Sequence, residues 1–263
     1  MKKLLLLAMT FVMMFSFTAC SGGSFLSEKD ILDVTTNPEA TITFEYDLED
    51  GEGVRQVELV FELYYNKAPS TVANFIKLSK EEYYNGKIVD YANVRGEAGE
   101  VSYFSAGRYY LDEEDGIIDG KKNYSIKGEF IANQWDANDL THELGSLVMD
   151  RDFGPGEAFD TASTRFYITL NESVQRNRNY CVFGKIKSSK YSLVKDGQTT
   201  GGVSSQSISS AFINDMLNLD TTSKALKDES MTLAQIPSKT ITIKSVVVDE
   251  KGVDYSKAKV AKA

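Results

Sequence analysis

The sequence predicts a mainly β protein that folds as one closed antiparallel barrel with helices over its ends. Three observations lead to this fold class. Several segments alternate apolar and polar residues with a period of two, which is typical of strands with one buried face. Asp-Gly and Asn-Gly pairs separate these segments and mark turns. Only two stretches have helical periodicity, so helices can cover the barrel but cannot build the fold.

The strand prediction begins at residues 41–46, where Thr-Ile-Thr-Phe-Glu-Tyr alternates strictly. A second strand is predicted over 57–63, because Leu59, Phe61 and Leu63 fall on one face. Later runs rich in β-branched and aromatic residues are predicted strands at 166–170, 181–186 and 240–248. The predicted turns are at 50–51, 85–86, 115–116 and 119–120.

Two segments are predicted helices. The first begins at Pro69, since proline suits the first turn of a helix, and Val72, Phe75 and Ile76 share its apolar face. The second is predicted over 209–219, where apolar residues again recur at helical spacing. Both helices are therefore expected to pack one face against the barrel.

Composition limits the possible functions. The chain has 263 residues, 42% hydrophobic and 25% charged, so it can bury a core and is too polar for a multi-pass membrane protein. It holds 29 Lys and Arg against 38 Asp and Glu, a net charge of −9. Binding to nucleic acid or to anionic lipid needs a basic face, so no nucleic-acid partner is expected. With two Cys and one His, a Cys/His zinc site is close to excluded and no metal is expected.

The N-terminus has the pattern of an export signal. Lys2 and Lys3 precede an uncharged apolar stretch over 4–17, which is too short for an ordinary membrane-spanning helix. Small residues then lead to Cys20 and a Ser/Gly-rich stretch, and this arrangement resembles a bacterial lipoprotein signal. The resemblance implies cleavage before Cys20, lipid attachment to its thiol, and anchoring in the bacterial cell envelope facing outside the cytoplasm. A plain secretory signal with an incidental cysteine is the alternative.

These patterns divide the chain into parts. We expect a signal peptide over 1–19, a lipidated cysteine and flexible tether over 20–38, a folded domain over 39–250 and a polar tail over 251–263. Inside the domain, a stretch rich in Ser, Gly, Lys and Thr at 187–207 predicts a surface loop insertion, and 226–237 is predicted as a further connection. Cys181 lies in an apolar run and is predicted to be a buried, inert thiol.

Six blocks in order resemble the cyclophilin-type peptidyl-prolyl isomerases. The opening block, 57–78, contains Ala-Pro, Thr-Val and Asn-Phe after a strand, as in that family. The later blocks are Tyr83-Tyr84-Asn85-Gly86, Glu129-Phe130 with His142 and 144–149, Thr164-Arg165-Phe166-Tyr167-Ile168-Thr169, 180–186 and 238–243. The resemblance implies an eight-stranded antiparallel barrel capped by two α-helices. It implies no cofactor and no catalytic role for His142.

The family's chemistry needs groups that this chain lacks at the matching positions. A peptide bond rotates slowly because resonance sets a barrier of about 18–20 kcal/mol, and a catalyst must favour the twisted amide. In the family an Arg donates to the prolyl amide, an apolar pocket holds the proline ring, and a Gln, a Trp and a His complete the groove. Here Tyr91 stands at the Arg position, Ser105 at the Gln, Gln175 at the Trp and Tyr180 at the His. Tyr167 stands at the pocket floor, where Phe is usual.

The catalytic group is therefore left open. Arg165, Arg95 or Arg108 could bring a guanidinium into the groove, and Arg165 is favoured because it adjoins the pocket strand. By resemblance, the predicted substrate-binding residues are Phe104, Ser105, Met149, Phe166, Tyr167, Gln175 and Tyr180.

Two functions follow from this reading. The first is an exported, membrane-anchored prolyl isomerase with a degenerate active site that acts in folding of exported proteins. The alternative is a catalytically weak or inactive peptide-binding chaperone or scaffold lipoprotein, since Tyr side chains give contact area at low entropy cost. In both cases the expected partners are proline-containing or unfolded exported polypeptides and a membrane reached through the lipid anchor, and a monomer is expected.

Overall fold

The computed structural model describes residues 36–94, 102–112, 116–152, 158–255 and 260. The predicted signal peptide, Cys20 and Arg95 lie outside the described residues. The strands are β1 Glu39–Asp47, β2 Val54–Leu63, β3 Lys87–Asn93, β4 Tyr103–Asp112, β5 Gly116–Asp119, β6 Ser146–Met149, β7 Phe166–Thr169, β8 Cys181–Lys195, β9 Gln198–Ser205, β10 Thr221–Ala225, β11 Thr232–Pro237 and β12 Ile241–Asp249. The helices are α2 Pro69–Lys80, the 3₁₀ turn η1 Ile131–Asn133 and α3 Ser210–Leu217. No helix of these segments is long and apolar enough to cross a membrane.

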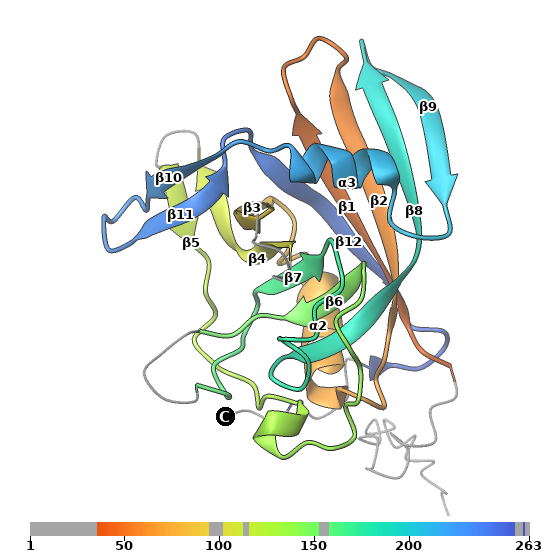
Figure 1. Cartoon of the computed structure of the whole chain (residues 1–263), viewed down its shortest axis with the longest axis vertical. Coiled ribbons are helices and arrows are strands. Elements are labelled where there is room, and N and C mark those ends of the chain that lie inside the picture. Colours follow the sequence, from red (N-terminus) through yellow and green to blue (C-terminus); the bar gives the residue numbers. More distant parts are fainter. Residues whose placement is uncertain (1–35, 95–101, 113–115, 153–157, 256–259, 261–263) are drawn as a thin grey trace, which may run out of the picture.

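Eight strands close into an antiparallel barrel, as predicted (Figure 1). Their order is β2-β1-β12-β3-β4-β7-β6-β8, and β8 returns to pair with β2 from Val54↔Val194 to Leu63↔Gly184. Antiparallel pairing along every step leaves no open edge in this ring, so its backbone groups are satisfied within the barrel.

The segment 187–207 was predicted as a loop, and the structure corrects this. β8 runs on to Lys195, and β9 folds back against its second half as a hairpin at one end of the barrel (Figure 1). Backbone pairing of β8 with β2 on one side and β9 on the other supplies the hydrogen bonds. Because the Ser, Lys and Gly side chains do not alternate in hydropathy, the pattern of side chains gave no sign of this strand.

The predicted connection over 226–237 also contains structure. Its second half is β11, which pairs with β10 in a two-stranded sheet beside the barrel (Figure 1). A small apolar cluster holds this hairpin on β3, β4 and β5. Its members are Ile88, Tyr109, Ile117, Leu226, Leu233 and Ile236. The hairpin thus forms a wall above the outer face of the barrel.

α2 covers one end of the barrel and has a buried acidic partner at its N-terminus. Phe75 of this helix packs against the rings of Phe166 and Phe183 in the core. The two carboxylate oxygens of Glu129 accept the backbone N–H groups of Ser70 and Thr71 at 2.8 and 2.9 Å. Burial raises the pKa of Glu129, and these N–H groups oppose that shift. The carboxylate therefore takes the place of an N-cap side chain.

α3 is held on the barrel by one aromatic and one acidic side chain. Phe212 is fully buried between the rings of Phe44 and Phe104. Asp215 accepts hydrogen bonds from the hydroxyls of Tyr46 and Tyr191 at 2.8 and 2.9 Å. The second predicted helix is therefore confirmed, and it covers the barrel as expected.

Strand alternation separates an inner row of side chains from an outer row. Along β7, Phe166 and Ile168 belong to the barrel core, whereas Tyr167 belongs to a separate outer cluster. β4 alternates in the same way, with Phe104 and Ala106 in the core. The registers carry each row across neighbouring strands. The outward-facing side chains of β3, β4, β7, β6 and β8 therefore form one continuous surface outside the core.

Removing the Glu129 carboxylate should destabilise the protein. We expect Glu129→Ala to lower the free energy of unfolding by about 2–3 kcal/mol, because two buried N–H groups lose a charged acceptor. Glu129→Gln keeps one acceptor oxygen and should lose less. Urea unfolding followed by circular dichroism measures both variants. A loss below roughly 0.5 kcal/mol for Glu129→Ala, the scale of an ordinary surface change, would contradict this role.

Candidate peptide-binding groove

An outward-facing row of side chains crosses five strands of the barrel. From β3 to β8 the paired residues of this row are Tyr91, Ser105, Tyr167, Val148 and Val182. Tyr103 and Tyr180 pack with Tyr167, Val148 and Val182 in a cluster that is separate from the barrel core. The barrel thus presents a floor of tyrosine and valine on its outer face.

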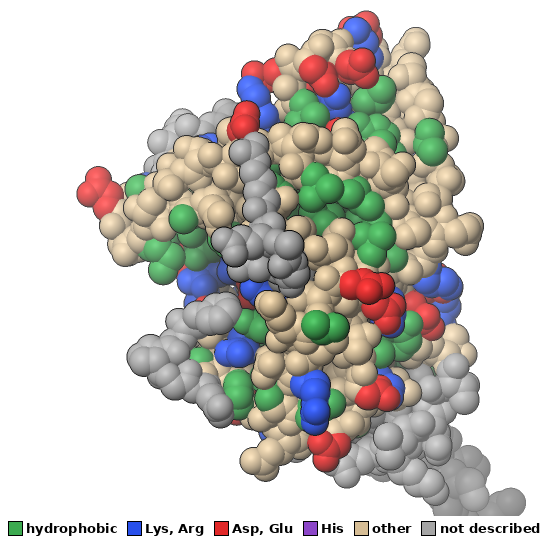
Figure 2. All heavy atoms as spheres, in the orientation of Figure 1, with side chains coloured by type: hydrophobic (Ala, Val, Ile, Leu, Met, Phe, Trp, Pro, Cys, Tyr) green, Lys and Arg blue, Asp and Glu red, His purple; other side chains and the backbone are tan. Residues whose placement is uncertain are grey.

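A groove of about 310 Å³ lies beside this row. The apolar part of its lining, which we call the apolar wall, consists of Tyr91, Tyr103, Tyr109, Met231 and Leu233. The charged part, which we call the charged wall, consists of Arg108, Asp150, Arg151, Asp152 and Arg165. In the space-filling view, apolar and basic side chains meet below the β10–β11 hairpin (Figure 2). The groove can therefore contact both apolar side chains and the polar backbone of an extended chain.

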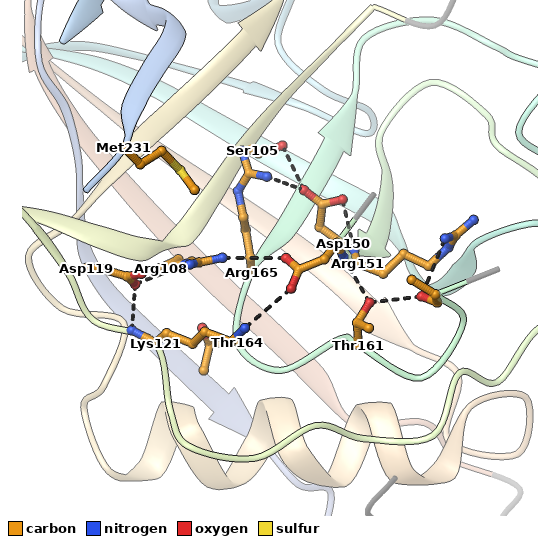
Figure 3. Close-up of polar contacts among 12 residues, drawn as sticks. Ser105, Arg108, Asp119, Lys121, Asp150, Arg151, Thr161, Thr164, Arg165 and Met231 are labelled. Carbon is orange, nitrogen blue, oxygen red and sulfur yellow. Dashed lines mark hydrogen bonds and ion pairs between the residues drawn. The ribbon is translucent and has the colours of Figure 1, made fainter. Parts of the chain in front are cut away.

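Arg165 lies in the groove and bridges the carboxylates of Asp90 and Asp150. Figure 3 shows its contact with Asp150. Its Nε donates to Oδ1 of Asp90 at 2.8 Å, and its Nη1 lies 2.8 Å from Oδ2 of Asp150. Burial alone would lower the pKa of Arg165, but the two carboxylates raise it above its usual range. Arg165 is thus a permanent cation that is already paired.

Asp90 is the buried end of this bridge. Its side chain has no exposed surface, and its Oδ2 has no hydrogen-bond partner among the described residues. Burial raises the pKa of Asp90 to about 6, although the positive charge of Arg165 opposes the shift. A carboxylate in this position needs Arg165 to offset the cost of burial.

A second set of ion pairs continues the charged wall (Figure 3). The guanidinium of Arg108 donates to both carboxylate oxygens of Asp119, through Nε at 2.9 Å and Nη2 at 2.7 Å. Asp152 lies 3.6 Å from Nη1 of Arg108 and 3.3 Å from Nζ of Lys121. Arg108 is therefore also committed to carboxylates of the chain.

Arg176 covers the tyrosine floor. Its guanidinium carbon lies 4.5 Å from the ring centroid of Tyr103, 5.5 Å from that of Tyr167 and 5.0 Å from that of Tyr180. Its Nη2 donates to the Tyr103 hydroxyl at 3.2 Å. Tyr167 is left with 0% of its surface exposed. A proline ring cannot contact the predicted pocket floor while Arg176 lies there.

His142 fixes the orientation of the Tyr167 ring from behind. The imidazole Nδ1 lies 3.0 Å from Oδ1 of Asn177, and Nε2 lies 2.8 Å from the Tyr167 hydroxyl. An amide oxygen only accepts, so Nδ1 carries the hydrogen and Nε2 accepts the tyrosine O–H. Burial lowers the pKa of His142 to about 4, so the ring is neutral at pH 7. The histidine therefore positions a ring and is not placed as a catalytic base for a substrate.

None of the seven predicted binding residues is among those that line the groove, and three of them face the barrel interior. Phe104, Met149 and Phe166 lie in the barrel core with at most 2% of their surface exposed. The prediction was wrong for these three because alternation along a strand sends neighbouring residues to opposite faces. Sequence blocks alone did not show which residue of each pair faces outward.

The other predicted residues lie on the outer side of the barrel. Ser105 is buried there, with its hydroxyl 3.5 Å from Oδ2 of Asp150. Tyr167 and Tyr180 belong to the outer cluster, and Gln175 is exposed in the turn beside Arg176. Their part in substrate binding stays a prediction. Cys181 is a free, buried thiol, and burial raises its pKa.

Sequence reasoning missed Arg176, Arg151 and Asp150. Arg176 directly follows Gln175, the residue that stands where the resemblance to the family places a tryptophan. The guanidinium of Arg151 lies 4.7 Å from the Tyr180 ring centroid, and Asp150 directly follows β6. Arg and Tyr side chains can form cation–π contacts, but the sequence does not show which of them meet, and only the folded chain brings these residues together. Within the described segments, no group of three or more His, Cys, Asp or Glu could hold a metal ion.

Comparison with known proteins gives consistent matches. Residues 47–211 match the family model described as cyclophilin type peptidyl-prolyl cis-trans isomerase/CLD. The chain is 33% identical over 141 residues to peptidyl-prolyl cis-trans isomerase B of Bacillus subtilis, covering 54% of this chain and 80% of the relative. It is 26% identical over 129 residues to peptidyl-prolyl cis-trans isomerase-like 3 of Gallus gallus, covering 49% and 69%.

Solved structures of a Cryptosporidium parvum cyclophilin type isomerase are also similar. One has a TM-score of 0.49 at 19% identity and covers 81% of this chain and 98% of the other. The second, determined in the presence of the dipeptide Ala-Pro, has a TM-score of 0.48 at 18% identity and covers 80% and 98%.

The raised pKa of Asp90 predicts how stability depends on pH. The folded-state value of about 6 lies above the ordinary value of 3.8, so the folded protein binds this proton more tightly. The stabilisation is complete below about pH 4 and is lost as the pH rises through about 6. The difference of about two pKa units corresponds to roughly 3 kcal/mol at most.

Asp90→Asn removes this titration and keeps the side-chain shape. We expect the unfolding free energy of wild type, minus that of Asp90→Asn, to be larger at pH 4 than at pH 8. Chemical denaturation across this pH range measures the difference. A difference independent of pH, or one that grows with rising pH, would show that the pKa of Asp90 is not raised in the folded protein.

Proposed function

The chain belongs to the cyclophilin-type peptidyl-prolyl cis-trans isomerase family, and we propose that it is an exported, membrane-anchored prolyl isomerase with a degenerate active site. Its substrates would be extended or unfolded exported polypeptides that contain X-Pro bonds. The observation that carries this proposal is the guanidinium of Arg165 in the groove, close to a tyrosine-rich wall.

Arg165 retains donors for a substrate. Its contacts with Asp90 and Asp150 use one N–H on Nε, one on Nη2 and one on Nη1, that is three of the five guanidinium donors. The two that remain can reach into the groove, because 29% of the side-chain surface is exposed. A donor to the prolyl nitrogen favours the twisted amide, in which the nitrogen lone pair is no longer delocalised. The paired carboxylates weaken this effect, which is consistent with slow catalysis.

The apolar wall supports binding of an extended chain. Tyr91, a half-buried residue, lines the groove, and Met231 of the β10–β11 hairpin is 49% exposed. Tyrosine and methionine contacts tolerate varied side chains, because both residues present large and adaptable apolar surfaces. A groove of this kind suits polypeptides of different sequence better than one small molecule.

A second candidate function follows from the covered floor. Tyr167 is fully buried under Arg176, so the pocket for the proline ring is closed in this conformation. This favours a peptide-binding chaperone or scaffold that holds extended chains in the groove of about 310 Å³ with little catalysis. The two candidates differ in whether the protein accelerates cis-trans isomerisation of the prolyl bond.

The location in the cell envelope is supported by sequence alone. The apolar stretch over 4–17, the small residues before Cys20 and the Ser/Gly-rich stretch after it form one consistent export and lipidation pattern. A lipid-anchored groove would meet exported polypeptides close to the membrane surface.

A protease-coupled assay on an Ala-Pro peptide tests the isomerase proposal. Wild type should exceed the background rate, and Arg165→Ala should lose about tenfold or more in kcat/KM, on the scale of removing one electrostatic donor. Because Arg165→Ala leaves Asp90 buried without its cation and risks unfolding, the double variant Asp90→Asn/Arg165→Gln removes the guanidinium without stranding a charge.

Asp90→Asn alone is the matched control and should keep most of the activity. If wild type does not exceed background, the enzyme proposal fails and the peptide-binding candidate stands. If all four proteins catalyse isomerisation equally fast, Arg165 takes no part in catalysis.

Metabolic labelling with palmitate tests the anchor. In a bacterial host, the full chain should incorporate label and sediment with membranes, whereas Cys20→Ser should do neither, because the thiol accepts the lipid. Cys181→Ser is the matched control and should behave as wild type. Equal membrane association of the Cys20→Ser variant, without label in either protein, would favour a plain secretory signal.

A further inference from the structure

Tyr103, Tyr167 and Tyr180 form a cage around a positive charge. The ring centroids of Tyr103 and Tyr167 are 4.9 Å apart, and those of Tyr167 and Tyr180 are 5.9 Å apart at an interplanar angle of 81°. Three faces therefore converge on one space outside the barrel core. Such a set of aromatic faces attracts cations, because each ring carries negative charge on its face.

The electrostatic surroundings of the cage add to this attraction. The carboxylate of Asp150 acts on all three tyrosines, and its charge contributes to raising the pKa of each hydroxyl, where burial is the largest cause. The chain as a whole is acidic, with a net charge of −9. Asp150 is also paired with Arg165, and the guanidinium of Arg151 lies 4.7 Å from the Tyr180 ring centroid, so the ring faces themselves are the main attraction for a cation here.

The present occupant of the cage belongs to the chain itself. Arg176 fills it from a turn between β7 and β8 whose neighbouring residues Val174 and Gln175 are exposed. Its Nη2 donates to the Tyr103 hydroxyl at 3.2 Å, and it also hydrogen-bonds to Tyr167, but no carboxylate within the described part of the chain forms an ion pair with it. The guanidinium is therefore held by the rings and hydroxyls of the tyrosines, contacts that another cation could make in its place.

We propose that the three-tyrosine cage is a cation subsite for an Arg or Lys side chain of the bound polypeptide, and that Arg176 is an internal stand-in that leaves when the ligand enters. This inference rests on the proposed peptide-binding function and names the substrate class of the same groove. The cage adjoins the groove through Tyr103, which belongs to both. A polypeptide lying along the groove would place a basic residue in the cage, and Arg176 would move into solvent.

Removing the stand-in tests the subsite. The probes are a proline-free peptide, acetyl-Gly-Arg-Gly-amide, and its citrulline analogue, which has the same shape without the charge. Isothermal titration calorimetry of the full chain should show that Arg176→Ala binds the arginine peptide about tenfold more tightly than wild type does. The same variant should prefer the arginine peptide to the citrulline peptide by a similar factor.

Two further variants make the result decisive. Arg176→Gln keeps a side chain over the rings without the charge, so it guards against collapse of the emptied cage and should also bind the arginine peptide more tightly than wild type. Arg176→Ala/Tyr180→Leu should lose the gain, and Val174→Ala, 82% exposed in the same turn, should bind as wild type does.

The proposal is overturned if neither Arg176 variant binds the arginine peptide better than wild type, or if citrulline and arginine peptides bind equally. Because the probes contain no proline, this outcome is separate from the isomerase assay, and either proposal can fail without the other.

Discussion

The pairing of β2 with β8 closes the sheet, and closure fixes which face of every strand meets the core. In a closed antiparallel ring a side chain points either inward or outward, and a slip of one residue would invert the whole strand. Phe166 and Tyr167 are neighbours in the sequence, yet one packs in the core and the other lies in the outer cluster. The groove is therefore a consequence of the ladder registers, since it lies beside the outer row, with Tyr91 in common, and is also lined by Met231 and Leu233 of the hairpin held on β3, β4 and β5.

A second constraint acts within the groove, where each of the described arginines already has partners inside the chain. Arg165 is held by Asp90 and Asp150, Arg108 by Asp119, and Arg176 by tyrosine rings. The buried carboxylate of Asp90 requires a nearby cation, so Arg165 contributes to stability, and under the proposed function it would also act in catalysis. A site in which the same guanidinium does both has less freedom to follow a rotating amide. The scaffold of an isomerase is retained, while its charged side chains are largely occupied with one another.

The fold could be predicted further than the site. Period-two alternation in β1 and β2 was visible because one face of each strand is buried, and the start of α2 was visible because Pro69 suits the first turn of a helix. The β8–β9 hairpin was not visible, because its Ser, Gly and Lys side chains are largely solvent-exposed and its stability comes from backbone pairing. At the site, the residue types were recognisable but their faces were not, as Phe104 and Met149 demonstrate. The Arg176 cage joins residues from β4, β7 and two loop positions, and no local sequence pattern predicts a contact between residues so far apart in the chain.

The central claim is that a proline-binding scaffold persists here while its working side chains are committed to internal partners. A crystal structure of the full chain with the Ala-Pro dipeptide tests it most directly. The account predicts that the dipeptide lies in the groove between Tyr91 and Arg165, with the Asp90 and Asp150 contacts of Arg165 intact. A dipeptide bound elsewhere, or bound with Arg165 released from both carboxylates and aligned on the prolyl amide, would contradict it.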